Sequence, residues 1–541
     1  MNHQLEVSLD ALFSQWQNGL CPGVQALIRR SGQDLYEKSF GCANLEHQIP
    51  ITSDTIFHVA SISKQFTVLA ILLLWKDGLL SLDDDVRTFA GDLISFKEPV
   101  SIRQMMNNVS GIRDQWELLF MRGIKINDSI TMDDVNTTLK MQRRLNFPPQ
   151  SAYLYSNTGF HLLSVITERI SGMSFPEFAR RRIFEPLHMD HTCVRQSYAQ
   201  IIPRLAYSYQ DEGNGSYYYN PLNYSLYGPT SVNTCARDLS RMLDEYIHPN
   251  HIDPEIIQVM KTPAVLTDGS QAEYCGGLMT RQLNGLTIYE HGGADAAYRG
   301  HVLCIPEKEL EIILLSNTTS RLMSDLASQA ARLVLGLSPE PEAAFPVQSL
   351  PAGLRKSSVN GEETAKFLPP RAGLFLTARP DDPQFISVTE KDGSFYMERE
   401  YGSTRLTDAG DGGWQVGTLK ERLYFLEDRM ICRLPGRFLT LWPAVPCTDR
   451  RFSDGTYLDE ETSMVLTISR EEDDSLHLSL PRYGSTGLYE PVIPASCSRP
   501  EASLPDPAFS FGPDFVMYAR PEADTLVLDG YRVKGMICRR L

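Results

Sequence analysis

The residue pattern of this 541-residue chain changes near position 340, and the change restricts the folds that the chain can adopt. Before it, stretches with helical periodicity alternate with short strand patterns, a mixture typical of α/β or α+β domains. After it, short alternating strand patterns are separated by Gly, Asp and Pro, as in antiparallel β-barrels and sandwiches. Residues 337–346 (LSPEPEAAFP) break both patterns and are typical of a linker. The sequence therefore predicts a mixed domain followed by all-β domains.

The all-β part contains a weak internal repeat. Three short strand patterns follow one another in each of two units, at 372–376, 385–388 and 392–397 and then at 454–458, 465–468 and 474–478. Chance likeness between two β-rich stretches is the alternative interpretation. The predicted organisation is a mixed α/β (α+β) domain at 1–335, a linker at 336–365, and all-β domains at 366–447 and 448–541.

Charge and hydropathy exclude several classes of function. Acidic residues outnumber basic ones, 67 to 51, and the formal net charge of −16 is spread along the chain, so we expect no nucleic-acid partner. The first residues, MNHQLEV, have neither the basic segment nor the apolar run of a secretory signal. The longest apolar stretch, Val68–Trp75, is shorter than the roughly 20 residues that cross a bilayer. We expect a cytoplasmic protein without a membrane partner.

The ten cysteines carry no recognisable motif. No two are spaced as C-x-x-C, and none lies near a histidine pair with zinc-site spacing. In a reducing compartment such cysteines are usually small buried hydrophobic residues. We therefore assign the cysteines no chemistry.

Five segments of the mixed domain have clear local patterns. Val24–Phe40 is typical of a β-hairpin, and Ile62–Lys76 and Thr158–Ile170 have helical periodicity. Strands are predicted at Leu286–Glu290 and Leu310–Leu315. Apart from one glutamate the second of these strands is apolar, as expected for a buried central strand.

The first helix opens with a chemically informative motif, FHVASISK at residues 57–64. Positions i and i+3 of a helix share a face, so the amine of Lys64 reaches the hydroxyl of Ser61. Free backbone N–H groups in a first helical turn favour developing negative charge. Apolar neighbours should desolvate Lys64 and lower its pKa, as a general base requires. The alternative is a solvated lysine, but residues 66–75 are apolar on nearly all sides.

Two further motifs lie far along the chain. In YSN at 155–157, Tyr155 is suited to relay protons, and Asn157 to orient the lysine and a substrate carbonyl. In HGGA at 291–294, the glycines allow a substrate backbone to lie close to a strand edge. Taken singly, Tyr155 is more often a core tyrosine and His291 more often a structural histidine.

In this order and spacing, the three motifs resemble S-x-x-K, Y-x-N and H-x-G of the penicillin-recognising serine hydrolases, over about residues 10–335. That group includes class C β-lactamases, D,D-peptidases, related esterases and D-aminopeptidases. Where relatives often have a histidine before Thr-Ser-Gly, this chain has Asn108-Val109-Ser110-Gly111. No G-x-S-x-G elbow, H-E-x-x-H motif, P-loop or dinucleotide fingerprint competes with this interpretation.

The resemblance implies a β-lactamase-like catalytic domain and two sets of site residues: Ser61, Lys64, Tyr155 and His291 as catalytic, and Asn157, Gly292, Gly293 and Ala294 as substrate-binding. Lys64, with Tyr155, would take the proton of Ser61 as its oxygen attacks a carbonyl. The backbone N–H groups of Ser61 and Ala294 would hold the oxyanion, and no metal or cofactor is needed.

Within that group the chain most resembles bacterial D-aminopeptidase, in which two antiparallel eight-stranded barrels follow the catalytic domain and a loop of the last barrel enters the active site. Arg482–Gly487 is the candidate for that loop, with an ordinary turn as the alternative. The implied function is release of N-terminal D-amino acids from peptides or amides. An esterase, a D,D-peptidase or β-lactamase-like hydrolase, and a non-catalytic sensor are the alternatives. The partner is a small peptide, amide or ester, and a homodimer is left open.

Overall fold

The computed structural model describes residues 3–338, except 18, 125–127, 212–214 and 320–322, and, beyond residue 338, strands β16 to β36 with short connections beside them. The chain divides into two compact units. Unit 1 consists of residues 1–210 and 217–338, and unit 2 consists of residues 211–216 and 339–541.

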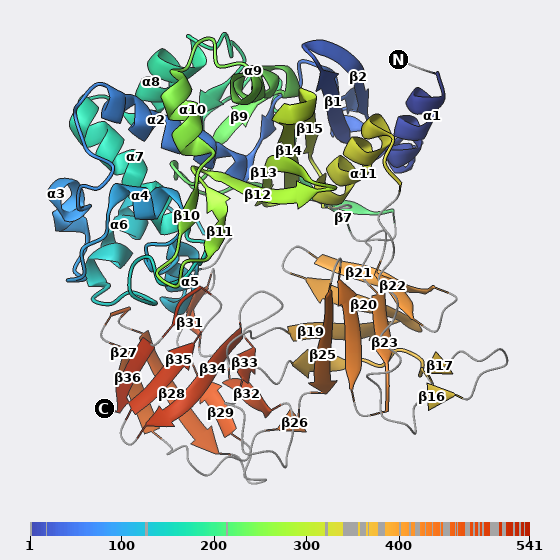
Figure 1. The fold of residues 1–541 in the computed structure, drawn as a ribbon. Helices are drawn as coiled ribbons and strands as arrows, with labels where there is room; N and C mark the ends of the chain where they lie inside the picture. The colour runs from blue at the N-terminus through green and yellow to red at the C-terminus, as the bar shows by residue number, and fades with distance from the viewer. Residues whose placement is uncertain are drawn as a thin grey trace. The chain divides into compact units, whose positions relative to one another are not determined.

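An eight-stranded antiparallel sheet forms the centre of unit 1 (Figure 1), with the strand order β10-β11-β12-β13-β14-β15-β1-β2. The hairpin at the start of the chain is thereby added to a block of strands from the end of the unit. The strands are β1 (Val24–Arg30), β2 (Gln33–Phe40), β10 (Pro263–Val265), β11 (Gln271–Cys275), β12 (Leu278–Leu283), β13 (Leu286–Asp295), β14 (Tyr298–Ile305) and β15 (Leu310–Ser316).

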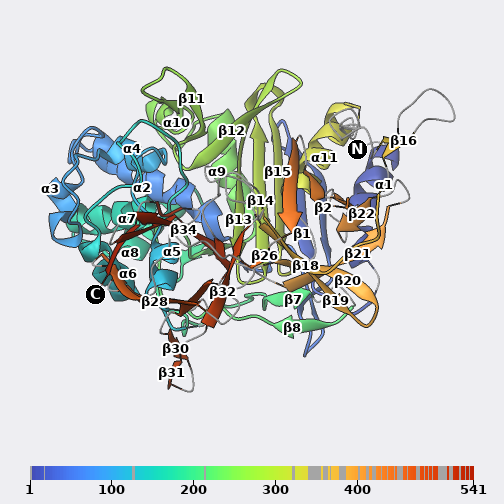
Figure 2. The same ribbon diagram turned by 90° about the horizontal axis from the view of Figure 1, so that it is seen from below.

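Helices cover both faces of this sheet (Figure 2). Helices α1 and α11 pack together against one face, and α9 packs against the other, beside the helical region formed by α2 to α8. The helices are α1 (His3–Leu12), α2 (Lys64–Lys76), α3 (Arg87–Ala90), α4 (Ile102–Met106), α5 (Gln115–Met121), α6 (Met132–Met141), α7 (Asn157–Ser171), α8 (Phe175–Ala179), α9 (Ala236–Ile247), α10 (Pro254–Met260) and α11 (Met323–Leu335).

Strand β1 supplies side chains to two apolar layers, as the alternation of a strand requires. Ala26 and Ile28 lie in the layer with α1 and α11, whereas Leu27 lies in the layer with the helical region. Every residue of β15 is buried, which confirms the predicted central strand. The predicted hairpin at 24–40 is confirmed as β1 and β2.

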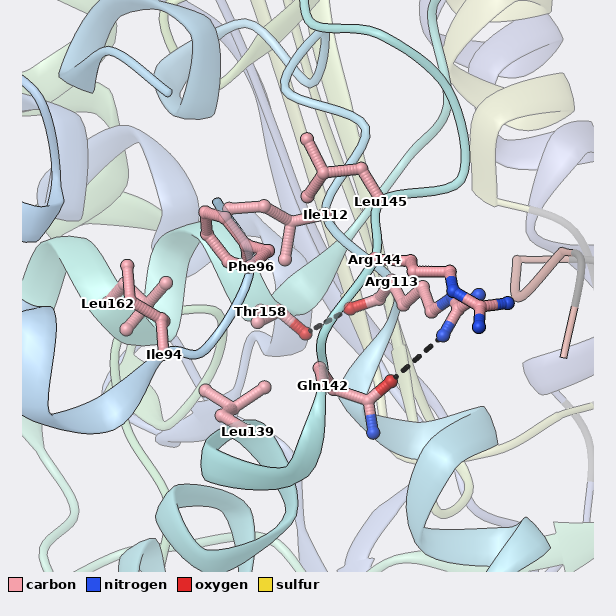
Figure 3. A pocket seen from close by; sticks show the side chains of 10 residues that line it. All are labelled: Ile94, Phe96, Ile112, Arg113, Leu139, Gln142, Arg144, Leu145, Thr158 and Leu162. Atoms are coloured by element: carbon pink, nitrogen blue, oxygen red, sulfur yellow. Dashed lines mark hydrogen bonds between the residues drawn. The ribbon is translucent and has the colours of Figure 1, made fainter. Parts of the chain in front are cut away.

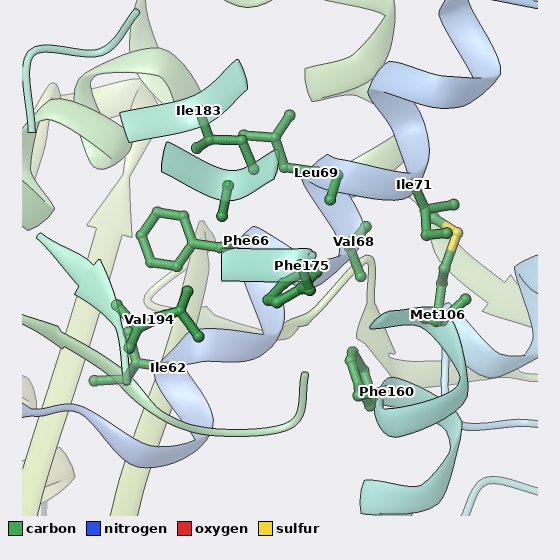
Figure 4. Packing of buried hydrophobic residues seen from close by; sticks show 14 of the residues in the cluster. Ile62, Phe66, Val68, Leu69, Ile71, Met106, Phe160, Phe175, Ile183 and Val194 are labelled. Atoms are coloured by element: carbon green, nitrogen blue, oxygen red, sulfur yellow. The ribbon is translucent and has the colours of Figure 1, made fainter. Parts of the chain in front are cut away.

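Helix α2 is buried on nearly all sides, as its apolar sequence predicts. Figure 4 shows its side chains Phe66, Val68, Leu69 and Ile71 among apolar groups from the surrounding helices. The helical pattern predicted at Ile62–Lys76 is confirmed from Lys64 to Lys76 as α2, and its first two residues belong instead to a 3₁₀ turn, η2, at residues 60–63. The predicted strand at 286–290 is too short, because β13 continues through the glycine motif to residue 295.

Unit 2 consists of antiparallel β-structure. Its first part is a closed barrel, made of β18 (Gly373–Leu376), β19 (Phe385–Lys391), β20 (Ser394–Arg399), β21 (Gly402–Asp408), β22 (Trp414–Val416), β23 (Arg422–Phe425), β24 (Met430–Leu434) and β25 (Arg437–Pro443). Its second part is a nine-stranded sheet, made of β26 (Val445–Pro446), β27 (Gly455–Asp459), β28 (Met464–Arg470), β29 (Leu476–Ser479), β32 (Val492–Cys497), β33 (Ala508–Ser510), β34 (Val516–Glu522), β35 (Thr525–Asp529) and β36 (Met536–Arg540). An additional pairing of β32 with β33 joins distant members of that sheet.

The repeated strand patterns occupy corresponding places in the two sheets. β18, β19 and β20 pair in succession, and so do β27, β28 and β29. The predicted linker at 336–365 lies for the most part outside the described residues, and the boundaries at 365 and 447 stay predictions.

The predicted loop at 482–487 is part of a β-hairpin. β30 (Arg482–Gly484) pairs with β31 (Gly487–Tyr489) in a separate two-stranded sheet. Ser485 and Thr486 lie outside the described residues. In the part of the chain that the structure covers, no helix is both long and apolar enough to cross a bilayer.

Candidate active site

The 3₁₀ turn before α2 presents Ser61 at the surface of unit 1. Ala60 has a positive φ of 47°, which is uncommon for a residue with a side chain, and the N–H of Ile62 bonds the carbonyl of Val59 at 3.1 Å. In a 3₁₀ turn, side chains at i and i+3 eclipse one another. Ser61 and Lys64 therefore remain neighbours although the serine lies outside the α-helix.

Lys64 is fully buried, and its amine is held by three oxygens. Nζ donates to Oγ of Ser61 at 2.9 Å, to Oδ1 of Asn157 at 2.9 Å and to the carbonyl of Pro229 at 2.9 Å. This arrangement fixes the amine against the hydroxyl of Ser61, the contact that the sequence motif predicts.

Asn157, the first residue of α7, is oriented by Asp114. Oδ2 of Asp114 accepts from both the backbone N–H and the side-chain Nδ2 of Asn157, each at 2.8 Å. The amide oxygen of Asn157 therefore turns toward Lys64. Figure 3 shows the adjacent contact that ties the two segments together, in which the hydroxyl of Thr158 donates to the carbonyl of Arg113 at 2.7 Å.

Asn108 supports the same segment at the position where relatives often have histidine. Its φ of 55° lies in the left-handed region, which asparagine tolerates better than most residues. Its Oδ1 accepts from the N–H of Ser156 at 3.0 Å, and its carbonyl accepts from the N–H of Leu154 at 3.0 Å. Both bonds position the loop that carries Tyr155.

Tyr155 packs between the lysine and the histidine. Nζ of Lys64 lies 4.8 Å from the centroid of its ring, and the ring of His291 lies 6.1 Å away. All four residues predicted as catalytic therefore meet at one place, two of them through a hydrogen bond and the other two through ring contacts.

His291 is a neutral imidazole with both nitrogens engaged. Burial, and then the charge of Lys64, lowers its pKa to about 3. Nδ1 lies 2.6 Å from the carbonyl of Gly292, which only accepts, so this nitrogen carries the proton. Nε2 then accepts from the hydroxyl of Tyr274 at 3.0 Å. Burial raises the pKa of Tyr274 well above its ordinary value, so that hydroxyl keeps its proton.

Strand β13 brings a free edge beside the serine. β12 pairs only with residues 286–290 of β13, and residues 291–295 pair with β14 alone among the described strands. A Cβ on Gly293 would lie 2.2 Å from the carbonyl oxygen of Val59, so glycine is required where the strand meets the 3₁₀ turn. Gly292 faces the other way, and a Cβ there would lie 3.5 Å from Nδ1 of His301. Ala294 is exposed.

Three contributors were missed by sequence reasoning: Asp114, Tyr274 and the carbonyl of Pro229. Asp114 has one local signal, since it caps α5 through the N–H of Trp116, but nothing in that signal indicates a contact with Asn157. Tyr274 and Pro229 belong to no motif.

This constellation agrees with the family comparison, in which residues 9–336 match the model of the Beta-lactamase family. The chain belongs to that family and is a serine hydrolase of the β-lactamase fold. It is similar to the D-aminopeptidase of Gluconobacter oxydans (strain 621H), with 28% identity over 347 residues, 63% of each chain. It is also similar to penicillin-binding protein 4* of Bacillus subtilis (strain 168), with 27% identity over 387 residues, 69% of this chain and 82% of that protein.

Among solved structures, the octameric penicillin-binding protein homologue from Pyrococcus abyssi is similar over 100% of both chains, with a TM-score of 0.56 and 21% identity. This likeness concerns the fold. The octameric state is a property of that protein.

Proposed function

We propose that the chain is a D-stereospecific aminopeptidase that works through an acyl-enzyme on Ser61. The observation that carries the chemistry is the contact of 2.9 Å between Nζ of Lys64 and Oγ of Ser61. With Lys64 neutral, the serine hydroxyl donates across the same contact, and Lys64 takes its proton as the oxygen attacks.

The other site residues have supporting roles in this proposal. The N–H groups of Ser61 and Ala294 hold the oxyanion, and the free edge of β13 provides main-chain groups for the substrate backbone. Tyr155 protonates the leaving amine as the C–N bond breaks. Asn157 orients Lys64, and neutral His291 fills the space between Tyr155 and β13 without adding a charge. Water then attacks the ester and releases the D-amino acid.

The substrate class is supported by the relatives and by unit 2. The Gluconobacter relative is named D-aminopeptidase, and the Pyrococcus structure shares the fold over the whole length of the chain. We take the two sheets of unit 2 as the two barrels of such an enzyme. A cytoplasmic location is part of the proposal, since a cell-wall D,D-peptidase or a resistance β-lactamase acts outside the cytoplasm.

The hairpin β30–β31 contains the segment that the resemblance to D-aminopeptidase assigns as the loop restricting the enzyme to chain ends, and that role for it is part of the proposal. Replacement of residues 483–488 by Gly-Gly should admit N-acetylated D-alanyl amides and lower the preference for a free amine. An unchanged preference in the folded variant would contradict this role for the hairpin.

The test is a panel of D-alanine p-nitroanilide, its L-enantiomer, nitrocefin and p-nitrophenyl acetate. We expect rapid release from the D-anilide, little from the L-anilide, and none by Ser61→Ala. Lys64→Arg should be as inactive as Ser61→Ala, because arginine stays protonated and cannot act as a base. Labelling by a fluorophosphonate should occur at Ser61. Labelling at another serine, with Ser61 unmodified, would contradict the assignment of Ser61 as the nucleophile.

A penicillin-recognising hydrolase of another specificity is the second candidate, favoured by the match to 82% of the Bacillus penicillin-binding protein. Hydrolysis or covalent trapping of nitrocefin, without turnover of the D-anilide, would favour it. Turnover of p-nitrophenyl acetate alone would favour an esterase.

A further inference from the structure

Strand β13 carries one more polar residue beyond the predicted motif. Asp295 is the last residue of the strand, one step after Ala294. Residues two apart in a strand point to the same face. Asp295 therefore shares the face of Gly293, which meets the backbone of Val59 and the side chain of Ala60, the two residues before the candidate nucleophile.

One oxygen of this carboxylate is held by three groups. Oδ2 of Asp295 lies 3.0 Å from Nε2 of His58 and accepts from the hydroxyls of Tyr224 at 2.5 Å and Thr230 at 2.6 Å. His58 lies three residues before Ser61, and Thr230 follows the proline whose carbonyl bonds Lys64. The carboxylate is thus fixed to both segments that surround the site.

The other oxygen is available. No group in the described part of the chain donates to Oδ1, and the side chain keeps 16% of its surface exposed. Burial favours the neutral acid, but hydrogen bonds from His58, Thr230 and Tyr224, together with the charge of His58, outweigh it and lower the pKa of Asp295. Among the described ion pairs, its one partner is His58, and neither lysine nor arginine pairs with it.

We propose that Oδ1 of Asp295 binds the α-ammonium group of the substrate. This rests on the proposed aminopeptidase function. With the carbonyl oxygen at the N–H of Ala294, the carbon bearing the amine lies beside the next residue of the strand, about 3.3 Å further on. A rigid carboxylate with one free oxygen binds an ammonium group by a charge-assisted hydrogen bond. An N-acetyl group offers no charge there, and the site therefore selects a free amino terminus.

The alternative is a purely structural role, in which Asp295 only positions His58 and Thr230. Loss of a structural residue lowers kcat/KM for every substrate alike, whereas loss of an ammonium site lowers it only for substrates that carry the charge. D-Alanine methyl ester and D-lactate methyl ester separate the two, because they differ in an ammonium against a hydroxyl. An ester acylates a serine nucleophile more readily than an amide does, so the comparison does not depend on peptidase activity.

The experiment measures kcat/KM of the full chain for both esters. The wild type should prefer the alanine ester, and Asp295→Asn should lower its kcat/KM about 10- to 100-fold, chiefly through KM, with the lactate ester nearly unchanged. Thr230→Val is the matched control, since it removes one donor to Oδ2 but keeps the charge. It should retain the preference.

An equal fall in kcat/KM for both esters in Asp295→Asn indicates a purely structural role for Asp295 and overturns the proposal. A wild-type alanine-to-lactate ratio near 1 overturns it without any variant, so the test survives a variant that does not fold. Failure of the aminopeptidase function has a different signature, in which the alanine ester is preferred but D-alanine p-nitroanilide is not cleaved.

Discussion

The two halves of β13 have different neighbours although they form one strand. Residues 286–290 pair with β12, and of these only Tyr289 and Glu290 also pair with β14, whereas residues 291–295 pair with β14 alone in the described structure and meet the Ser61 turn on the side that β12 leaves. The first half carries Ile288, which is fully buried in the layer with α1 and α11. The second half carries His291, the two glycines and Asp295. The strand thus changes from scaffold to site where its pairing with β12 ends and its pairing with β14 continues.

This difference predicts that substitutions separate along the strand. In residues 286–290, which pair with β12, substitutions should change the free energy of unfolding and leave the chemistry of the folded molecules intact. In residues 291–295, substitutions on the face toward the Ser61 turn should change turnover. The following experiments test that separation, with p-nitrophenyl acetate as a substrate that needs only the nucleophile and its surroundings.

The largest effect is expected for Gly293→Ala. Its Cβ would lie 2.2 Å from the carbonyl oxygen of Val59, so the strand must move away from the Ser61 turn. Displacement of the oxyanion site by about 1 Å lowers kcat/KM about 100- to 1,000-fold. Gly292→Ala is the matched control, because its Cβ meets only ordinary contacts, and we expect it to keep its activity. Equal activity in the two variants would contradict the role of Gly293.

In the half that pairs with β12, Ile288→Ala should destabilise the protein by about 2–5 kcal/mol, the usual range for removing a fully buried isoleucine. Denaturant unfolding measures this loss. Under conditions where the variant is folded, its kcat/KM should equal that of the wild type. A fall in kcat larger than the unfolded fraction explains would show that the halves are not separate.

A smaller effect on turnover is expected for Asp114→Ala. It removes the acceptor that turns the amide oxygen of Asn157 toward Lys64, and we expect kcat to fall about 10- to 100-fold. Asp114 also caps α5, so stability falls by about 1 kcal/mol as well. Asp253→Ala is the control, since Asp253 caps α10 through the N–H of Glu255. It should lose stability without losing kcat.

What the sequence predicts well is local. Ser61 and Lys64 are three residues apart, so helical geometry alone joins them, and the hairpin at 24–40 and the strand at 310–315 follow from short periodic patterns. Glycines weaken a strand pattern, and the predicted end at Glu290 follows that rule. Pairing with β14 overrides it, and β13 continues.

What the sequence misses depends on contacts between distant segments. Asp114 lies 43 residues from Asn157, and Asp295 lies 237 residues from His58. A single aspartate has no periodicity or motif that names its partner. The turn at Ala60 was missed for a related reason, because its neighbours are distant in sequence: β13 packs against it at Gly293, and the N–H of Val59 bonds the carbonyl of Val232.

The smallest effect that we expect is a change in how the free energy of unfolding depends on pH. It concerns β15, which lies in the sheet but carries no predicted site residue. Glu311 on β15 is buried, and burial, followed by the neighbouring Asp244, raises its pKa to about 9 despite the cation of Arg29. In the unfolded chain an ordinary glutamate ionises near pH 4.5. Between these values the folded state binds more protons than the unfolded state, so stability falls as the pH rises.

Glu311→Gln removes this dependence because an amide does not titrate. Between about pH 6 and about pH 8, the wild type should lose on the order of 1–2 kcal/mol more stability than the variant in denaturant unfolding. Glu177→Gln is the control, because hydrogen bonds from Arg180 lower the pKa of Glu177 to about 2, far from this window. Equal losses in wild type and Glu311→Gln would mean that Arg29 keeps the buried carboxylate ionised in the folded protein, and the sheet would then contain an ion pair where we expect a protonated acid.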